Sequence, residues 1–245
     1  MSTYTRPFLL LSTRPEDEAA AAELASFLSA MGLPAGAIEQ RSLERAPLGR
    51  VDLDAYSGVL LGGSPFNNTD ASKSRLQLRV EREIGTLVAA IIDRDVPLLG
   101  ACYGIGAIGT AIGARLSSRY AEDAASIELS LNDAGAADPL LAGLPSRFST
   151  IVGHKEAVEH LPDAATVLVT GEACPTQMFR VRSNVYATQF HPELTAESLE
   201  LRLRIYADQG YFDANELESI LETAYAADYS WNRRILENFA ARYAR

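Results

Sequence analysis

Two patterns of hydrophobic residues alternate along the first hundred positions. Short runs are apolar throughout, and the segments between them repeat apolar residues every three or four positions. The first pattern predicts buried strands and the second predicts amphipathic helices. The predicted strands are Phe8–Ser12, Ala37–Gln40, Gly58–Gly62 and Val96–Gly100, and the predicted helices are an alanine-rich one after Pro15 and a long one from about Ser72 to Asp93. Fully apolar strands separated by helices are typical of a parallel sheet covered on both faces.

The pattern changes in the second half of the chain. Apolar and polar residues alternate in segments that predict antiparallel strands beside the parallel sheet. These segments are Ile127–Leu131 and parts of Thr166–Thr170, Gln177–Val181 and Val185–Phe190. From Thr195 onward the spacing is helical again, and Asn215–Arg245 fits one or two helices that pack on the body.

These elements predict an α/β fold with a doubly wound, mostly parallel, flavodoxin-like sheet and helices on both faces. An antiparallel extension and extra C-terminal helices complete it. No composition break marks a second domain, so residues 1–245 are expected to form one domain, with a core of about 7–208 and a helical extension of about 213–245.

The stretch Val96–Ala114 carries no charged residue and is long enough to span a membrane nominally. It contains Pro97 and five glycines, which are better suited to a short buried strand, a turn and a closely packed helix. We therefore expect no membrane segment.

Composition and charge exclude several classes of protein. The net charge of −10 argues against a nucleic-acid partner, because binding to phosphate backbones rests on clustered lysine and arginine. The N-terminal apolar run is too short for a secretory signal, which predicts a cytoplasmic protein. Cys102 and Cys174 are too few for a disulfide framework, and no cysteine and histidine cluster has zinc-ligand spacing, so neither a metal nor another cofactor is implied.

A cysteine lies between glycines directly after the last of the predicted parallel strands. Gly100-Ala101-Cys102-Tyr103-Gly104 has the form of a nucleophile elbow, the strained turn between a strand and a helix that presents a reactive side chain. Flanking glycines let strand and helix approach, and the helix N-terminus favours a thiolate. The turn alone leaves open a second interpretation, in which Cys102 is a small buried residue. Cys174 lacks such a turn and is expected to be structural.

A histidine that could serve this cysteine lies in Gln189-Phe190-His191-Pro192-Glu193-Leu194, at the end of a strand-like run. Pro192 favours an extended backbone at His191, so that Glu193 could accept a hydrogen bond from the imidazole and fix its tautomer. A surface turn without a partner is the alternative for this hexapeptide alone.

The two motifs together resemble the class I glutamine amidotransferase family, in particular the glutaminase part of GMP synthetases and their standalone relatives. His191 follows Cys102 by about ninety residues, as in the family, and Leu60-Leu61-Gly62-Gly63-Ser64-Pro65 is similar to the family's glycine-rich oxyanion loop. The resemblance covers about residues 7–195.

The resemblance implies a role for each matching residue. Cys102 would attack a carboxamide carbon, His191 would transfer protons and Glu193 would orient His191. Backbone N–H groups of Gly63 and Tyr103 would stabilise the oxyanion. Ser64, Pro65, Gly106 and His154 are the candidate substrate-lining residues.

The sequence departs from the family at Gly106, where a glutamine usually helps to hold the substrate. Glycine has no side-chain donor or acceptor, which makes a different γ-glutamyl substrate one explanation. Gly104, Gly106 and Gly109 match a dinucleotide-binding pattern only formally. Neither a phosphate-binding loop nor the pyrophosphate loop of an attached synthetase domain is present.

The sequence leaves three candidate functions for the protein. The first is a glutaminase-type amidotransferase that acts through a Cys102 thioester and releases ammonia from glutamine for a separate synthase subunit. The second is a standalone γ-glutamyl hydrolase or peptidase for a substituted γ-glutamyl compound. The third is a redox or interaction protein without turnover on the same fold, which has no need for the His191 and Glu193 pair.

Overall fold

The computed structural model describes residues 5–206 and 212–245. Its strands are β1 (Phe8–Ser12), β2 (Ile38–Ser42), β3 (Gly58–Leu61), β4 (Leu98–Ala101), β5 (Arg115–Ser117), β6 (Glu122–Leu131), β7 (Arg147–His154), β8 (Ala157–His160), β9 (Ala165–Thr170), β10 (Met178–Val181) and β11 (Val185–Thr188). Its helices are α1 (Asp17–Ala30), α2 (Arg75–Arg94), α3 (Tyr103–Ala111), α4 (Asp133–Ala136), α5 (Ala196–Ile205), α6 (Leu217–Ala226) and α7 (Ser230–Tyr243).

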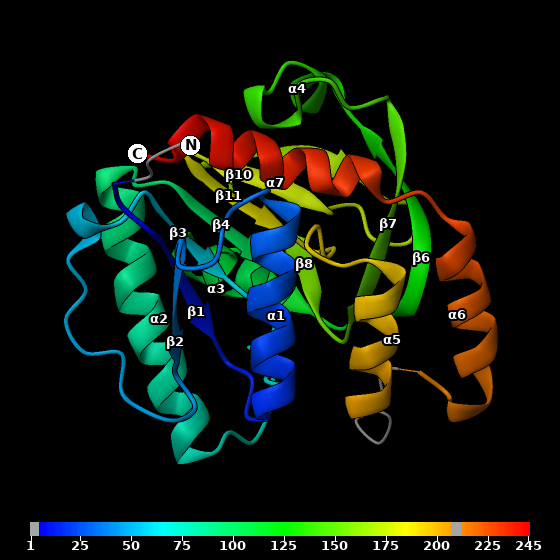
Figure 1. The fold of residues 1–245 in the computed structure, drawn as a ribbon, viewed down its shortest axis with the longest axis horizontal. Helices are drawn as coiled ribbons and strands as arrows, with labels where there is room; N and C mark the ends of the chain where they lie inside the picture. Colours follow the sequence, from blue (N-terminus) through cyan, green and yellow to red (C-terminus); the bar gives the residue numbers. More distant parts are fainter. Residues whose placement is uncertain (1–4, 207–211) are drawn as a thin grey trace.

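One mixed sheet organises the described residues, with strand order β2-β1-β3-β4-β11-β10-β9-β6-β7 (Figure 1). The strands from β2 to β11 in this order are parallel, and β10, β9, β6 and β7 continue the sheet in antiparallel pairs. This arrangement confirms the predicted parallel core with an antiparallel extension.

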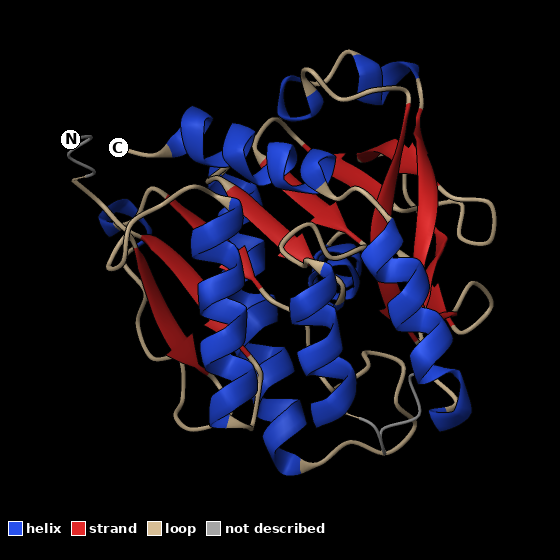
Figure 2. Ribbon diagram, turned by 45° about the vertical axis from the view of Figure 1, so that its right-hand side comes forward, coloured by secondary structure: helices blue, strands red, loops and turns tan. Residues whose placement is uncertain are grey.

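Helices cover both faces of the parallel part (Figures 1 and 2). Alternate residues of β1, β3 and β4 point to opposite faces, and both sets are buried. One set packs with α1 and α7, and the other with α2 and α3. Phe239 of α7 contacts Phe8 of β1, with ring centroids 5.9 Å apart. The C-terminal α7 is therefore part of the core, while α5 and α6 form a third apolar cluster with β6 and β7.

One expectation needs correction, and three strands were not predicted. The strand from Val185 ends at Thr188, and it is antiparallel only to β10, because its other neighbour is the parallel strand β4. β7 was not predicted, since the buried Thr150 interrupts its apolar pattern. The small antiparallel pair of β5 and β8 was not predicted either, because its strands are only three and four residues long.

The uncharged stretch from Val96 to Ala114 contains β4 and α3. Within the described ranges, none of the helices combines the length and the apolar character that crossing a bilayer requires.

Candidate active site

Cys102 and His191 come together because their strands are neighbours in the sheet. β4 and β11 are parallel, with Ala101 opposite Thr188, so both chains leave the sheet at the same edge. Cys102 follows β4 directly and His191 lies three residues beyond β11. Carboxyl ends of parallel strands are where such folds place their ligands. Both side chains line one pocket at this edge.

The backbone at Cys102 has the strained geometry of a nucleophile elbow, with φ 53° and ψ −96°. Its N–H donates to the carbonyl of Thr188 at 2.8 Å, and α3 begins at the next residue. A Cβ atom at Gly100 would lie 3.0 Å from the backbone of Gly104, and one at Gly104 would lie 3.2 Å from the carbonyl oxygen of Leu61. The glycines therefore permit the close packing of strand and helix that the turn requires.

His191 is held by two charged groups. Its Nδ1 donates to Oε1 of Glu193 at 2.8 Å, and Nη2 of Arg202 donates to the same oxygen at 2.9 Å. Nη1 of Arg202 lies 3.1 Å from the imidazole Nδ1. All three side chains are buried. With Nδ1 engaged by the carboxylate, the tautomer and the ring orientation of His191 are fixed.

These contacts shift the pKa values of both groups. Burial on its own lowers the pKa of His191, but the charges of Glu193 and Cys102, and a hydrogen bond with Cys102, outweigh it and raise the pKa to about 9. Burial on its own raises the pKa of Glu193, but the nearby His191 and Arg202 lower it to about 2. The geometry thus favours an imidazolium at His191 beside an ionised carboxylate at Glu193.

A second buried ion pair extends this network. Nε of Arg14 donates to Oε1 of Glu23 at 3.2 Å, and Nη2 of Arg202 lies 4.0 Å from the same oxygen. Ser12 donates to the other carboxylate oxygen of Glu23 at 2.7 Å. Arg14 and Arg202 both line the pocket with Cys102. Buried charges are tolerated only when they are paired, and here each cation has a carboxylate partner.

The glycine-rich loop after β3 lies against His191. A Cβ atom at Gly63 would be 2.5 Å from Nη2 of Arg14 and 3.0 Å from Cε1 of His191, so a side chain there would displace these two groups. Thr13 donates to the carbonyl oxygen of Gly63 at 3.1 Å and so orients the loop backbone. Tyr103 is the first residue of α3, where N–H groups lack acceptors within the helix. The oxyanion role of the Gly63 and Tyr103 N–H groups stays a prediction from the sequence.

Two pockets meet at Cys102. The larger lies between β7 and α5, and most of its lining side chains are apolar. The smaller has a mostly polar lining that includes His154, Lys155 and Gln189. Ser64 lines both pockets, and of the following residues Phe66 and Asn67, rather than Pro65, line the smaller one. His154 therefore lines a pocket with Cys102, and its contact with a substrate stays a prediction.

The space above Gly106 is filled by another part of the chain. A Cβ atom at Gly106 would overlap Nδ2 of Asn68 and lie 3.0 Å from Oε1 of Glu156. The buried Glu156 carboxylate accepts four hydrogen bonds of 2.7–2.8 Å, two from Asn68 and two from Thr69. Gly106 itself does not line the smaller pocket, but Glu156 does. The loop that carries Asn68 therefore occupies the space that a side chain at position 106 would need.

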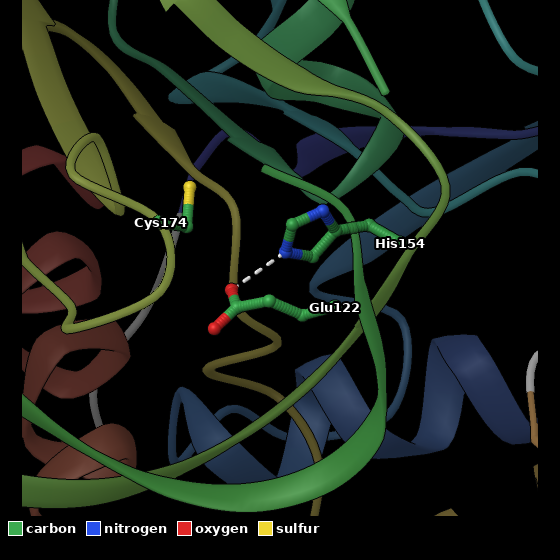
Figure 3. A group of neighbouring side chains, drawn as sticks. All are labelled: Glu122, His154 and Cys174. Carbon is green, nitrogen blue, oxygen red and sulfur yellow. Dashed lines mark hydrogen bonds and ion pairs between the residues drawn. The ribbon is translucent and has the colours of Figure 1, made fainter. Parts of the chain in front are cut away.

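His154 also belongs to a second group of cysteine, histidine and glutamate side chains (Figure 3). Glu122, His154 and Cys174 bring one ligand atom each within 4.8 Å of one another, a proximity that their sequence spacing does not reveal. Oε2 of Glu122 is 2.8 Å from Nε2 of His154 and accepts from Gln177 at 2.6 Å. Neighbouring ligand atoms of a tetrahedral zinc ion with bonds of about 2.0 Å are about 3.3 Å apart, so the 2.8 Å spacing is that of a hydrogen bond.

Cys174 is poorly suited to nucleophilic attack. Its side chain is buried, and burial raises the pKa of its thiol to about 12. Its Sγ contacts the carbonyl oxygen of Thr176. The group around His154 therefore joins β6 and β7 to the chain segment before β10, and Cys102 has the surroundings of a reactive thiol.

Sequence reasoning missed the residues that complete the network, which are Arg14, Glu23, Asn68, Glu156 and Arg202. Arg202 lies on α5 among alternating charged residues and resembles a solvent-exposed position. Glu23 lies in an alanine-rich helix at a position that is fully buried. An acidic residue within a predicted buried stripe is the one signal that could have marked Glu23.

The chain is similar in sequence to known proteins. The family model described as Glutamine amidotransferase class-I matches residues 39–203. The chain is 33% identical over 149 residues to one of the subunits of the glutamine-hydrolyzing GMP synthase of Methanothermobacter thermautotrophicus, covering 60% of this chain and 71% of that protein. It is 29% identical to the glutamine-hydrolyzing GMP synthase of Borreliella burgdorferi, of which it covers only 27%.

Solved structures share the fold over nearly the whole chain. A glutamine amidotransferase from Thermotoga maritima has a TM-score of 0.77 at 19% identity, and the alignment covers 98% of each chain. A glutamine amidotransferase from Methylobacillus flagellatus has a TM-score of 0.73 at 16% identity, covering 98% of this chain and 94% of that one. At these identities the likeness concerns the fold.

Proposed function

The chain belongs to the class I glutamine amidotransferase family, and we propose that it hydrolyses the side-chain amide of glutamine through a Cys102 thioester. The observation that carries the proposal is the buried His191 and Glu193 pair beside a cysteine on a strained elbow. The family match favours an enzyme over a redox or interaction protein.

In the first step, the Cys102 thiolate attacks the amide carbon, and N–H groups of Gly63 and Tyr103 hold the oxygen that becomes negative. Such a donor contributes about 3 kcal/mol to transition-state stabilisation. The His191 imidazolium gives its Nε2 proton to the amide nitrogen, and the C–N bond breaks. Ammonia is released, and a γ-glutamyl thioester remains on Cys102. Because Nδ1 is bonded to Glu193, Nε2 is the nitrogen that faces the reaction.

In the second step, neutral His191 takes a proton from water, which attacks the thioester carbon. The C–S bond breaks, glutamate leaves, and the thiolate and imidazolium pair is restored. Glu193 and Arg202 stabilise and orient the imidazole throughout without exchanging protons with the substrate.

The ammonia acceptor is proposed to be a separate synthase subunit. One relative is itself named as a single subunit of a GMP synthase, which implies a second subunit in that protein. The GMP synthase of Borreliella burgdorferi is much longer than the region of it that matches this chain. A cytoplasmic location stays a prediction from the sequence.

Release of glutamate from glutamine tests the proposal, measured for the wild type, Cys102→Ala and the matched control Cys174→Ala. Cys102→Ala is expected to abolish release while Cys174→Ala retains it. If no Cys102-dependent release occurs, alone or with candidate synthase subunits, the proposed function is wrong.

A further inference from the structure

The nucleophile lies between two pockets of opposite character. Among the residues that line them, the two share Ser64 and Cys102. An acyl group on Cys102 therefore extends into one pocket, and the amine that leaves must pass into the other.

The position of His191 decides which pocket receives the amine. The leaving nitrogen must accept a proton from His191, so it must lie on the side of the sulfur that faces the imidazole. His191 lines the larger pocket between β7 and α5, and it does not line the smaller one. The smaller pocket offers Lys155, Gln189 and Asn67 to the charged amino-acid end of a γ-glutamyl group.

The chemistry of the larger pocket is unsuited to ammonia alone. Its walls include Leu199 and Leu203 of α5 and Ile151 of β7, and these side chains belong to the apolar cluster beneath α6. An apolar wall stabilises a substrate only when the substrate has apolar surface to bury.

We propose that this enzyme accepts γ-glutamyl amides whose nitrogen carries a short apolar substituent, which occupies the pocket between β7 and α5. The inference rests on the proposed Cys102 thioester chemistry and names the leaving groups that the same site takes. The amide C–N bond breaks as in glutamine, and the product is a primary amine in place of ammonia.

Two cationic side chains of the larger pocket should make the enzyme select against charged substituents. Arg14 and Arg202 line the same pocket, and both are buried and paired with carboxylates. A substituent with a terminal ammonium group would meet these guanidinium groups and lose its hydration. The pocket should therefore favour an uncharged chain over a cationic chain of the same length.

The test compares kcat/KM for glutamine, γ-glutamyl n-butylamide and γ-glutamyl 4-aminobutylamide. The butylamide is expected to match or exceed glutamine, and the aminobutylamide to be at least tenfold poorer than the butylamide. If glutamine is hydrolysed and the butylamide is not, this inference is wrong while the proposed function stands. If no compound shows Cys102-dependent hydrolysis, the proposed function itself fails.

Substitutions in α5 test whether the substituent on the amide nitrogen lies in the larger pocket. Leu203→Phe narrows the pocket and should lower the ratio of butylamide to glutamine kcat/KM at least tenfold, about the effect of one or two methylene groups. Leu199→Ala, which widens the pocket, should raise the ratio for longer amides. Leu201→Phe is the matched control, because Leu201 lies on α5 but does not line the pocket. An unchanged ratio in both pocket variants would place the amine elsewhere and overturn the inference.

Discussion

Arg202 donates a hydrogen bond of 2.9 Å to Glu193, on the same carboxylate oxygen that accepts Nδ1 of His191. The contact joins α5 to the loop after β11, and both side chains are buried. Without Arg202 the Glu193 carboxylate would keep one cationic partner in place of two.

Arg202→Met should therefore destabilise the protein by about 3–5 kcal/mol, the usual cost of removing one partner of a buried ion pair. Urea unfolding measures it. Arg204→Met is the control, because Arg204 lies on the same helix in an exposed pair with Glu200 and should have little effect. Equal effects of the two substitutions would contradict the account of the buried network.

Glu193→Gln should lower the pKa of His191 from about 9, because burial, which lowers this pKa, remains while the raising charge of Glu193 is lost. Titration of the imidazole signals by NMR measures the shift, and only three histidines need to be resolved. A His191 pKa that stays near 9 in this variant would show that Glu193 is not its main partner.

The His191 and Glu193 pair also makes the stability of the folded protein depend on pH. The raised pKa of His191 stabilises the folded state fully below pH 6.5, and this contribution is lost as the pH rises through about 9. The lowered pKa of Glu193 stabilises it above pH 4.5, and this contribution is lost as the pH falls through about 2. The combined contribution of His191 and Glu193 to the free energy of unfolding should be highest between pH 4.5 and 6.5. Glu193→Gln should weaken the decrease in the free energy of unfolding between pH 6.5 and 9.

The sequence was sufficient to predict the parallel core and the Cys102, His191 and Glu193 group, for physical reasons. Buried strands such as Leu98–Ala101 are apolar throughout, and a nucleophile elbow needs glycines at fixed positions. The sequence could not show that β11 lies beside β4, which is the contact that brings His191 to Cys102. Pairing between distant strands depends on the whole sheet.

Polar residues that act through distant partners were the least predictable. Glu156 is one residue of a short exposed-looking segment, yet it binds the loop at Asn68 and Thr69 from across the site. The absence of a side chain at Gly106 was visible in the sequence, whereas the side chain that fills its place was not.

Gly106→Ala should displace Asn68 from the Glu156 carboxylate, because the added methyl group overlaps the Asn68 amide. We expect a loss of about 1–3 kcal/mol in stability, typical of overpacking, and a higher KM for glutamine from disorder at the edge of the smaller pocket. Gly85→Ala in α2 is the control, since nothing lies within 4 Å of its Cβ position, and it should gain about 1 kcal/mol from helix propensity. A Gly106→Ala enzyme with unchanged stability and KM would contradict this role of Asn68.

Iodoacetamide should distinguish the two thiols of the native protein. Cys102 lines both pockets and is partly exposed, whereas Cys174 is buried and the pKa of its thiol is about 12. Peptide mapping after brief treatment at pH 7 should find Cys102 alkylated and Cys174 intact, with both alkylated after unfolding. Preferential labelling of Cys174 would contradict the described burial.

The central claim is a γ-glutamyl thioester on Cys102, and the mass of the acid-quenched enzyme during turnover of glutamine tests it most directly. We predict an added mass of one glutamyl group, located by peptide mapping on the peptide that contains Cys102, and absent from Cys102→Ala. A glutamyl group found on Cys174, or glutamate release from Cys102→Ala at the wild-type rate, would contradict the account.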